Sequence, residues 1–149
     1  MKYNLNIKNK KAFFNYELLN KYKFIAGIVL LGSEVKSIKQ NKVSLNNSYC
    51  KLINNNIYVY DMYISNNYFG ENFDSKRIKK ILLKKKEIYK IKNKINEFKF
   101  NIIPTKILLN NRGYIKLIFF LAKSKTKYDK RQSIKIKEIE REKKKLINN

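Results

Sequence analysis

Short apolar runs alternate with polar, lysine-rich stretches along the chain, and the spacing within these runs predicts strands more often than helices. The longest run covers residues 24–31, contains three β-branched residues and is followed by Gly32, which is typical of a buried strand. Ser33 then provides a candidate N-cap for a short helix over residues 34–40. We therefore expect a strand that leads directly into a helix.

Two hairpins are expected after this helix. Asparagines occupy positions 54–56, and asparagine tolerates the left-handed backbone of tight turns. A second turn signal, Asn-Asn-Arg-Gly, covers residues 110–113. Pro104, the single proline, favours a strand start or an edge position because it donates no backbone hydrogen bond. The four strands that flank these turns are predicted over residues 43–53, 57–64, 102–109 and 114–122.

A basic amphipathic helix is expected between the hairpins. Apolar residues recur at helical spacing over residues 84–98, with lysines on the outer face. That face is either a solvated surface or a contact for RNA. In the strand before it, alternation places Tyr58, Tyr60, Met62 and Ile64 on one face.

The order of these elements predicts the fold class. A strand, a short helix, a hairpin, a basic helix and a second hairpin fit a mainly β protein with flanking helices, a small antiparallel barrel of the oligonucleotide-binding type. A ferredoxin-like sheet is the alternative. Apolar density falls after Ala122. We therefore expect a barrel domain over residues 1–122 and a basic tail over residues 123–149, disordered or helical on a partner.

The net charge narrows the classes of partner. The chain has 35 Lys and Arg against 11 Asp and Glu, a formal charge of +24. A field of this sign attracts polyanions, and nucleic acid is the leading candidate because each neutralised phosphate releases condensed counterions. An anionic membrane is the rival partner. Drift toward A/T-rich codons explains a share of the lysines, but glutamate also has A-rich codons and stays rare.

Tyrosines and cations that lie close together in the sequence are the candidate RNA contacts. Tyr16, Tyr49 and Tyr58 are able to stack on exposed bases, with packing in the barrel as the alternative for each. The tail carries a dense basic cluster, with a tyrosine and an aspartate embedded in it, over residues 123–131.

Composition argues against catalysis and metal binding. There is no histidine and a single cysteine, Cys50, which excludes His-based metal sites, zinc fingers and His-containing triads. The carboxylates Glu34, Asp61 and Asp74 show no paired spacing, and Cys50 is expected in the core. We therefore expect no enzyme activity, no cofactor and no metal.

The chain shows no sign of membrane insertion. Its first eleven residues lack the apolar region of a signal peptide. The longest apolar run is far shorter than the roughly 18–20 residues that a membrane-spanning helix needs. We expect a soluble, cytoplasmic monomer.

Two sequence blocks, Glu-Val-Lys-Ser at 34–37 and Asp-Lys-Arg at 129–131, are together similar to motifs of one known family, the SsrA-binding proteins (small protein B) of bacterial trans-translation. The resemblance covers about residues 7–145, and these two blocks are its most specific part. The other matching stretches are residues 9–13, 26–30, 32–33, 47–49, 82–83, 122–123 and Tyr128.

The resemblance implies a function as well as a fold. It implies a barrel that binds the tRNA-like domain of transfer-messenger RNA (SsrA RNA) and delivers it to stalled ribosomes. It also implies a tail that enters the vacant decoding site and messenger channel, against small-subunit rRNA. The alternatives are a general or ribosomal RNA-binding protein, an RNA-modifying enzyme that uses Asp61 or Glu34, and a basic protein of membrane surfaces.

The resemblance also assigns residues. RNA contacts with the tRNA-like domain are implied for Tyr16, Lys36, Lys39, Lys42, Tyr49, Lys76 and Arg77. The decoding-site tail is implied for Lys123, Lys125, Lys127, Tyr128, Asp129, Lys130 and Arg131. Ile25 stands where the family usually has an acidic residue, and the segment between Tyr16 and Ala26 is about two residues longer. Ser124 and Thr126 replace a glycine and a lysine of the family pattern.

Overall fold

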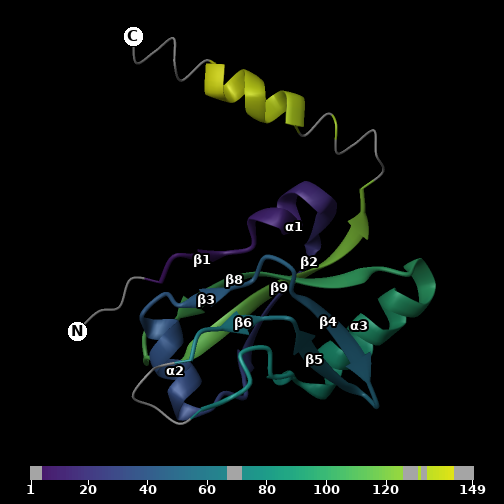
Figure 1. Ribbon diagram of the computed structural model, residues 1–149. Coiled ribbons are helices and arrows are strands. Elements are labelled where there is room, and N and C mark those ends of the chain that lie inside the picture. Colours follow the sequence, from purple (N-terminus) through teal and green to yellow (C-terminus); the bar gives the residue numbers. More distant parts are fainter. Residues whose placement is uncertain (1–4, 67–71, 126–130, 132–133, 143–149) are drawn as a thin grey trace.

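The computed structural model describes residues 5–66, 72–125, 131 and 134–142 (Figure 1). Within these residues the strands are β1 (Ile7–Lys8), β2 (Tyr16–Ile28), β3 (Val43–Ser44), β4 (Tyr49–Ile53), β5 (Asn56–Tyr60), β6 (Tyr63–Ile64), β7 (Lys79–Leu82), β8 (Asn101–Leu109) and β9 (Ile115–Ser124). The helices are α1 (Lys10–Asn15), α2 (Gly32–Lys39) and α3 (Lys85–Phe98), and residues 134–142 are also helical.

Six antiparallel strands pair in a ring. The order is β8, β4, β5, β7, β2 and β9, and β9 pairs with β8 to complete the circle. β1 adds to the end of β8, while β3 and β6 form a separate pair. α2 and α3 lie at opposite sides of this barrel (Figure 1). The predicted barrel with flanking helices is confirmed, and the ferredoxin-like alternative is wrong because its sheet would be open.

The core fills the inside of the ring. Phe24 of β2 and Phe119 of β9 stack there with ring centroids 5.3 Å apart. Ile57 and Leu117 are fully buried beside them, and Ile91 of α3 is fully buried in the same cluster. Each such side chain contributes about 1.5–3 kcal/mol by leaving water. The apolar alternation of the strands and the helical spacing of α3 therefore serve one core.

The first long strand begins and ends closer to the N-terminus than the predicted range of residues 24–31. β2 begins at Tyr16 and ends at Ile28. Its pairing with β9 shifts register between Leu18 and Lys23, where β2 uses more residues than β9. The additional residues of β2 thus form a bulge opposite β9. After β2 the chain leaves the sheet, because Leu31 is the N-cap of α2.

The N-cap prediction for the short helix is wrong. Ser33 lies inside α2, and the N–H of Leu31 donates to Glu34 Oε1 at 2.8 Å. The glutamate therefore caps the helix from its third position. α2 ends before Asn41, whose φ of 58° is left-handed.

Both strands of the first predicted hairpin are interrupted. The turn at residues 54–56 is confirmed in place, since Asn54 and Asn55 have positive φ. Asp61 also has positive φ, at 57°, and separates β5 from β6. The predicted face pattern is therefore wrong beyond this residue: Val59 and Met62 are both buried. The strand predicted over 43–53 likewise divides into β3 and β4.

Three elements were not predicted from the sequence: β1, α1 and β7. β7 is hidden by its lysines, one of which, Lys79, points inward and is fully buried. Pro104 does not lie at the start of β8. It is buried within this strand beside a register shift toward β9, and β9 is its one strand partner among the described pairings, as at a sheet edge.

Candidate nucleic-acid interface

A groove of about 640 Å³ brings two of the predicted tyrosines together. Tyr16, at the start of β2, and Tyr49, at the start of β4, both line it. Both also pack against the small cluster of Ala12, Ile103 and Ala122. α1 is therefore the element that positions this pair, because it carries Ala12 beneath the two rings.

Asn9 fixes α1 at this end of the groove. Its Oδ1 accepts the N–H of Ala12 at 3.1 Å, and its Nδ2 donates to the carbonyl of Pro104 at 2.8 Å. Asn9 is 2% exposed, so both bonds are protected from water. The asparagine cap thus ties the short helix to β8.

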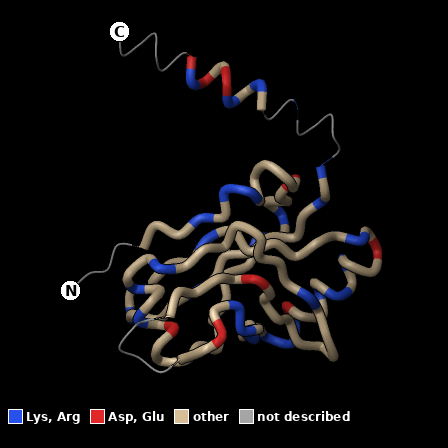
Figure 2. Tube along the Cα trace, viewed as in Figure 1, with Lys and Arg blue, Asp and Glu red and all other residues tan. Residues whose placement is uncertain are grey.

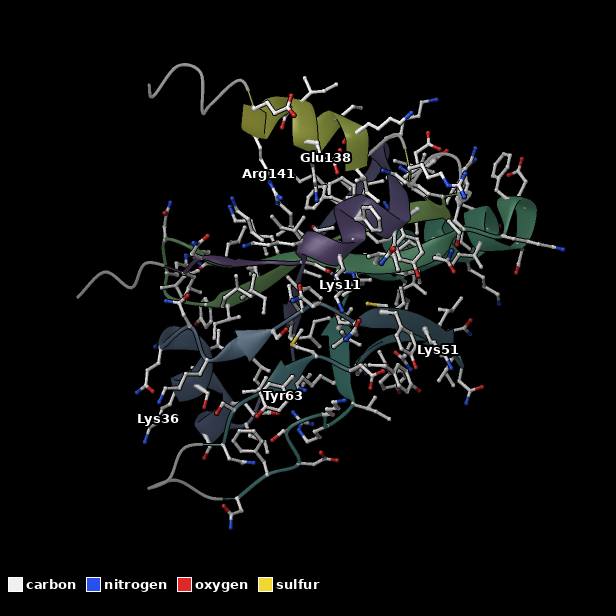
Figure 3. All side chains as sticks on the ribbon, turned by 45° about the horizontal axis from the view of Figure 1, so that its top comes forward. Lys11, Lys36, Lys51, Tyr63, Glu138 and Arg141 are labelled. Carbon is white, nitrogen blue, oxygen red and sulfur yellow. The ribbon has the colours of Figure 1, made fainter. Side chains whose placement is uncertain are left out.

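Cations and aromatic rings share the wall of the groove. Tyr49 stacks on Tyr60 with ring centroids 5.4 Å apart and planes 7° apart. The Lys51 amine lies 5.5 Å from the first ring and 5.2 Å from the second. Lys11 and Lys51 both line the groove (Figure 3). Tyrosine faces and ammonium groups in one groove can stack bases and pair phosphates.

Three predicted lysines lie elsewhere. Lys36 and Lys39 belong to α2, and Lys42 follows it. Lys36 and Lys42 are exposed and Lys39 is half-buried; among the described residues, none of the three lines the groove. Lys and Arg are spread over several elements rather than gathered on one (Figure 2). Any RNA that contacts both α2 and the groove must therefore cover more than one side of the barrel.

Arg77 takes part in a buried ion-pair network. Its Nη2 lies 2.5 Å from Glu34 Oε1 and its Nε 3.2 Å from Oε2. The Lys79 amine lies 3.8 Å from Glu34 Oε2, and both of these side chains are 0% exposed. Lys76 is exposed. The network joins α2 to β7, and no sequence pattern predicts it because Glu34 is far from both partners along the chain.

The Lys79 amine has a perturbed pKa. Burial lowers its pKa from 10.5 to about 8; the Glu34 and Asp74 charges oppose this shift and the Arg77 charge adds to it. Lys79 also donates to the carbonyl of Arg77. It is a structural cation inside the barrel rather than a contact for RNA.

The start of the predicted tail block is held against α1. β9 continues to Ser124, and the N–H of Lys125 donates to the Asn15 carbonyl at 3.0 Å. The Lys125 amine donates to the Phe13 carbonyl, also at 3.0 Å. Lys123 and Arg131 are exposed. Lys127, Tyr128, Asp129 and Lys130 lie outside the described residues.

Catalytic and metal-binding chemistry finds no support in the described part of the chain. Cys50 is buried, as predicted, and burial raises the pKa of its thiol. Glu34 is committed to the ion-pair network. Over the ranges that the structure describes, no group of three or more metal-ligating side chains occurs, and no helix is long and apolar enough to cross a membrane.

The fold and the groove define the class first: small, basic β-barrel proteins that bind nucleic acid. The sequence model of the SmpB protein family matches residues 6–149. The SsrA-binding protein of Cytophaga hutchinsonii is 45% identical over 141 residues, which cover 93% of this chain and 91% of the relative. That of Mycoplasma mycoides is 43% identical over 144 residues, 95% of each chain.

A solved structure agrees with these relatives. A chain from "tmRNA-SmpB: a journey to the center of the bacterial ribosome" superposes with a TM-score of 0.68 at 31% identity, covering 88% of this chain and 95% of the other. The protein belongs to the SmpB family, a family of RNA-binding proteins. The resemblance seen in the sequence motifs is confirmed.

Proposed function

We propose that the protein binds the tRNA-like domain of transfer-messenger RNA and delivers this RNA to stalled ribosomes for trans-translation. Membership of the SmpB family, relatives named SsrA-binding proteins and the likeness to a chain from a tmRNA–SmpB ribosome structure support this function. The protein acts by binding, with no catalytic step of its own. We propose that it acts in the cytoplasm, where its ribosomal target is, and that it acts as a monomer.

The observation in this chain that carries the proposal is the groove with its two tyrosines. Tyr16 and Tyr49 come from distant parts of the sequence and line one open groove with Lys11 and Lys51. Structured RNA offers unstacked bases in its loops, and these bases stack on aromatic side chains while lysines bind the phosphates. Lys36, Lys39, Lys42, Lys76 and Arg77 are proposed as further contacts to the same RNA.

A competition titration tests this function. Labelled tRNA-like domain would be bound at one fixed, near-physiological salt, with elongator tRNA and single-stranded RNA as competitors, because electrostatic affinity varies steeply with salt. We expect Tyr49→Ala to weaken binding about tenfold, the loss of one stacked base at about 1.4 kcal/mol. Tyr114→Ala is the control, since Tyr114 is 64% exposed and does not line the groove.

Equal competition by every RNA would instead favour the second candidate, a general or ribosomal RNA-binding protein of the same barrel class. The specific observation that favours this candidate is the spread of positive charge over several elements, which attracts any polyanion (Figure 2). An unchanged affinity for Tyr49→Ala would remove the groove from the proposal.

For the tail, we propose that residues 123–149, with Lys123, Lys125, Lys127, Tyr128, Asp129, Lys130 and Arg131, occupy the vacant decoding site and messenger channel. β9 runs to Ser124, and Lys125 donates to the Asn15 carbonyl at the end of α1, so both are part of the barrel domain. A truncated chain should therefore end after Lys125. We expect this chain to bind the tRNA-like domain as the full chain does and to lose ribosome rescue in a trans-translation assay. Parallel loss of RNA affinity and rescue would contradict the division of roles between the barrel and the tail.

A further inference from the structure

Three aromatic rings form a cluster where α3 ends and the bulged part of β2 passes it. Phe98 and Phe100 stack with centroids 5.1 Å apart and planes 16° apart. Tyr22 lies 6.1 Å from Phe100. Phe98 is 50% exposed, so one face of this ring cluster (Tyr22, Phe98 and Phe100) is open to solvent.

The backbone explains how the rings come together. Lys99 has a φ of 54°, the left-handed conformation, and ends α3 as its C-cap. The chain therefore turns sharply between Phe98 and Phe100 and brings their rings into contact. Tyr22 belongs to the part of β2 where the register with β9 shifts. The ring cluster thus includes a residue from the bulged part of β2.

Lysines surround the ring cluster. The amines of Lys90 and Lys94 lie 5.7 and 5.8 Å from the Tyr22 ring. Lys94 is also 5.5 Å from the Phe98 ring, and Lys123 is 5.8 Å from Phe100. Two acids of the described residues adjoin this group: Glu97 pairs with Lys94 at 3.6 Å, and Glu17 is the cross-strand partner of Lys123. Three cations against these two acids leave the surroundings of the exposed ring positive.

We propose that the ring cluster is a second RNA contact, where an unpaired nucleotide stacks on Phe98 and its neighbouring phosphates pair with Lys90 and Lys94. The half-exposed Phe98 ring has the Lys94 amine beside it and two further amines at the neighbouring rings, which matches both halves of a nucleotide, the base and the phosphate. The base must be unpaired, because the bases of a duplex are stacked on one another and offer no free face. The proposal takes RNA as the ligand class from the proposed function.

The position of the ring cluster suits an RNA that also fills the groove. Phe100 belongs to the ring cluster and lines the groove that holds Tyr16 and Tyr49. Ile95 and Asn96, one turn before Phe98 on α3, line the same groove. A single-stranded segment that leaves the groove on this side therefore reaches Phe98 without crossing the barrel.

The test measures binding of a short labelled oligouridylate to the full chain, over a series of salt concentrations. We expect Phe98→Ala to weaken binding about tenfold without changing the salt dependence, because stacking involves no counterion release. Phe98→Trp should retain the affinity, since it keeps an aromatic face. Lys94→Ala should lower the slope of log affinity against log salt by about 0.7, the loss of one phosphate contact.

Tyr89→Ala is the matched control. Tyr89 lies on the same helix and is 68% exposed, but it is not one of the three rings. The proposal is overturned if Phe98→Ala binds the oligouridylate as the native chain does, or if Tyr89→Ala weakens binding equally. Its failure is distinguishable from failure of the proposed function, because Tyr49→Ala and the labelled tRNA-like domain report on the groove independently.

Discussion

Glu34→Gln tests the buried network that joins α2 to β7. Glutamine keeps the size of the side chain and can still accept from the N–H of Leu31, so the helix cap survives. The substitution removes the negative charge that faces Arg77 and Lys79, which lie at 2.5 and 3.8 Å from the carboxylate. Any loss of stability therefore reports on the two cations rather than on helix capping.

The magnitude follows from the two cations separately. Lys79 has a pKa of about 8, so deprotonating its amine at pH 7 costs about 1.4 kcal/mol. Without the Glu34 charge the amine can become neutral at this cost, so the destabilisation through Lys79 is at most about 1.4 kcal/mol. Arg77 loses charged hydrogen bonds worth about 1.5–3 kcal/mol in all. The low end of this range applies, because the Arg77 side chain is 31% exposed and still donates to the Val29 carbonyl. The free energy of unfolding should fall by about 3 kcal/mol.

Urea unfolding at pH 7, followed by circular dichroism, measures this change as a shift in midpoint at constant slope. Glu97→Gln is the control, because Glu97 pairs with Lys94 at 3.6 Å on the exposed face of α3 and should contribute less than about 1 kcal/mol. A loss below about 1 kcal/mol for Glu34→Gln, or equal losses for the two variants, would refute the reasoning.

Two further substitutions test the same backbone and charge arguments. Burial places the pKa of Lys79 at about 8 in the folded chain, against 10.5 in the unfolded chain. Between these pH values the unfolded chain therefore binds more protons than the folded chain. The contribution of Lys79 to the free energy of unfolding then rises with pH through this window, by about 3 kcal/mol in total. From pH 8 to 10.5 the urea midpoint of the native chain should rise relative to that of Lys79→Met. A constant difference between the two midpoints would contradict the lowered pKa of Lys79. Lys99→Gly should raise the thermal midpoint, by about 1 kcal/mol in stability, because glycine adopts the φ of 54° without strain; an unchanged or lower midpoint would show that the lysine is not strained there.

The parts of the fold that the sequence predicts are those set by neighbouring residues. The spacing of Ile91 and Ile95 places α3 to within one residue of its start, and the turn residues place the hairpin of β8 and β9. β7 is missed because Lys79 occupies an inward position where alternation demands an apolar residue. That lysine is tolerated because Glu34, from a distant segment, faces it and because the carbonyls of Met62 and Arg77 accept its hydrogen bonds. No local pattern contains this information.

The candidate site likewise combines residues that the sequence motifs suggested with contacts that only the tertiary fold creates. Spacing alone gave no reason to pair Tyr16 with Tyr49; the family motifs suggested both, and α1, itself unpredicted, brings them into one groove. The ring cluster depends still more on the tertiary fold, since it needs a register shift in β2 and a left-handed residue after α3. The lysine-rich sequence predicts a polyanionic partner. The fold places aromatic rings among those lysines. The positions of these rings determine which part of an RNA binds specifically, beyond the general electrostatic attraction.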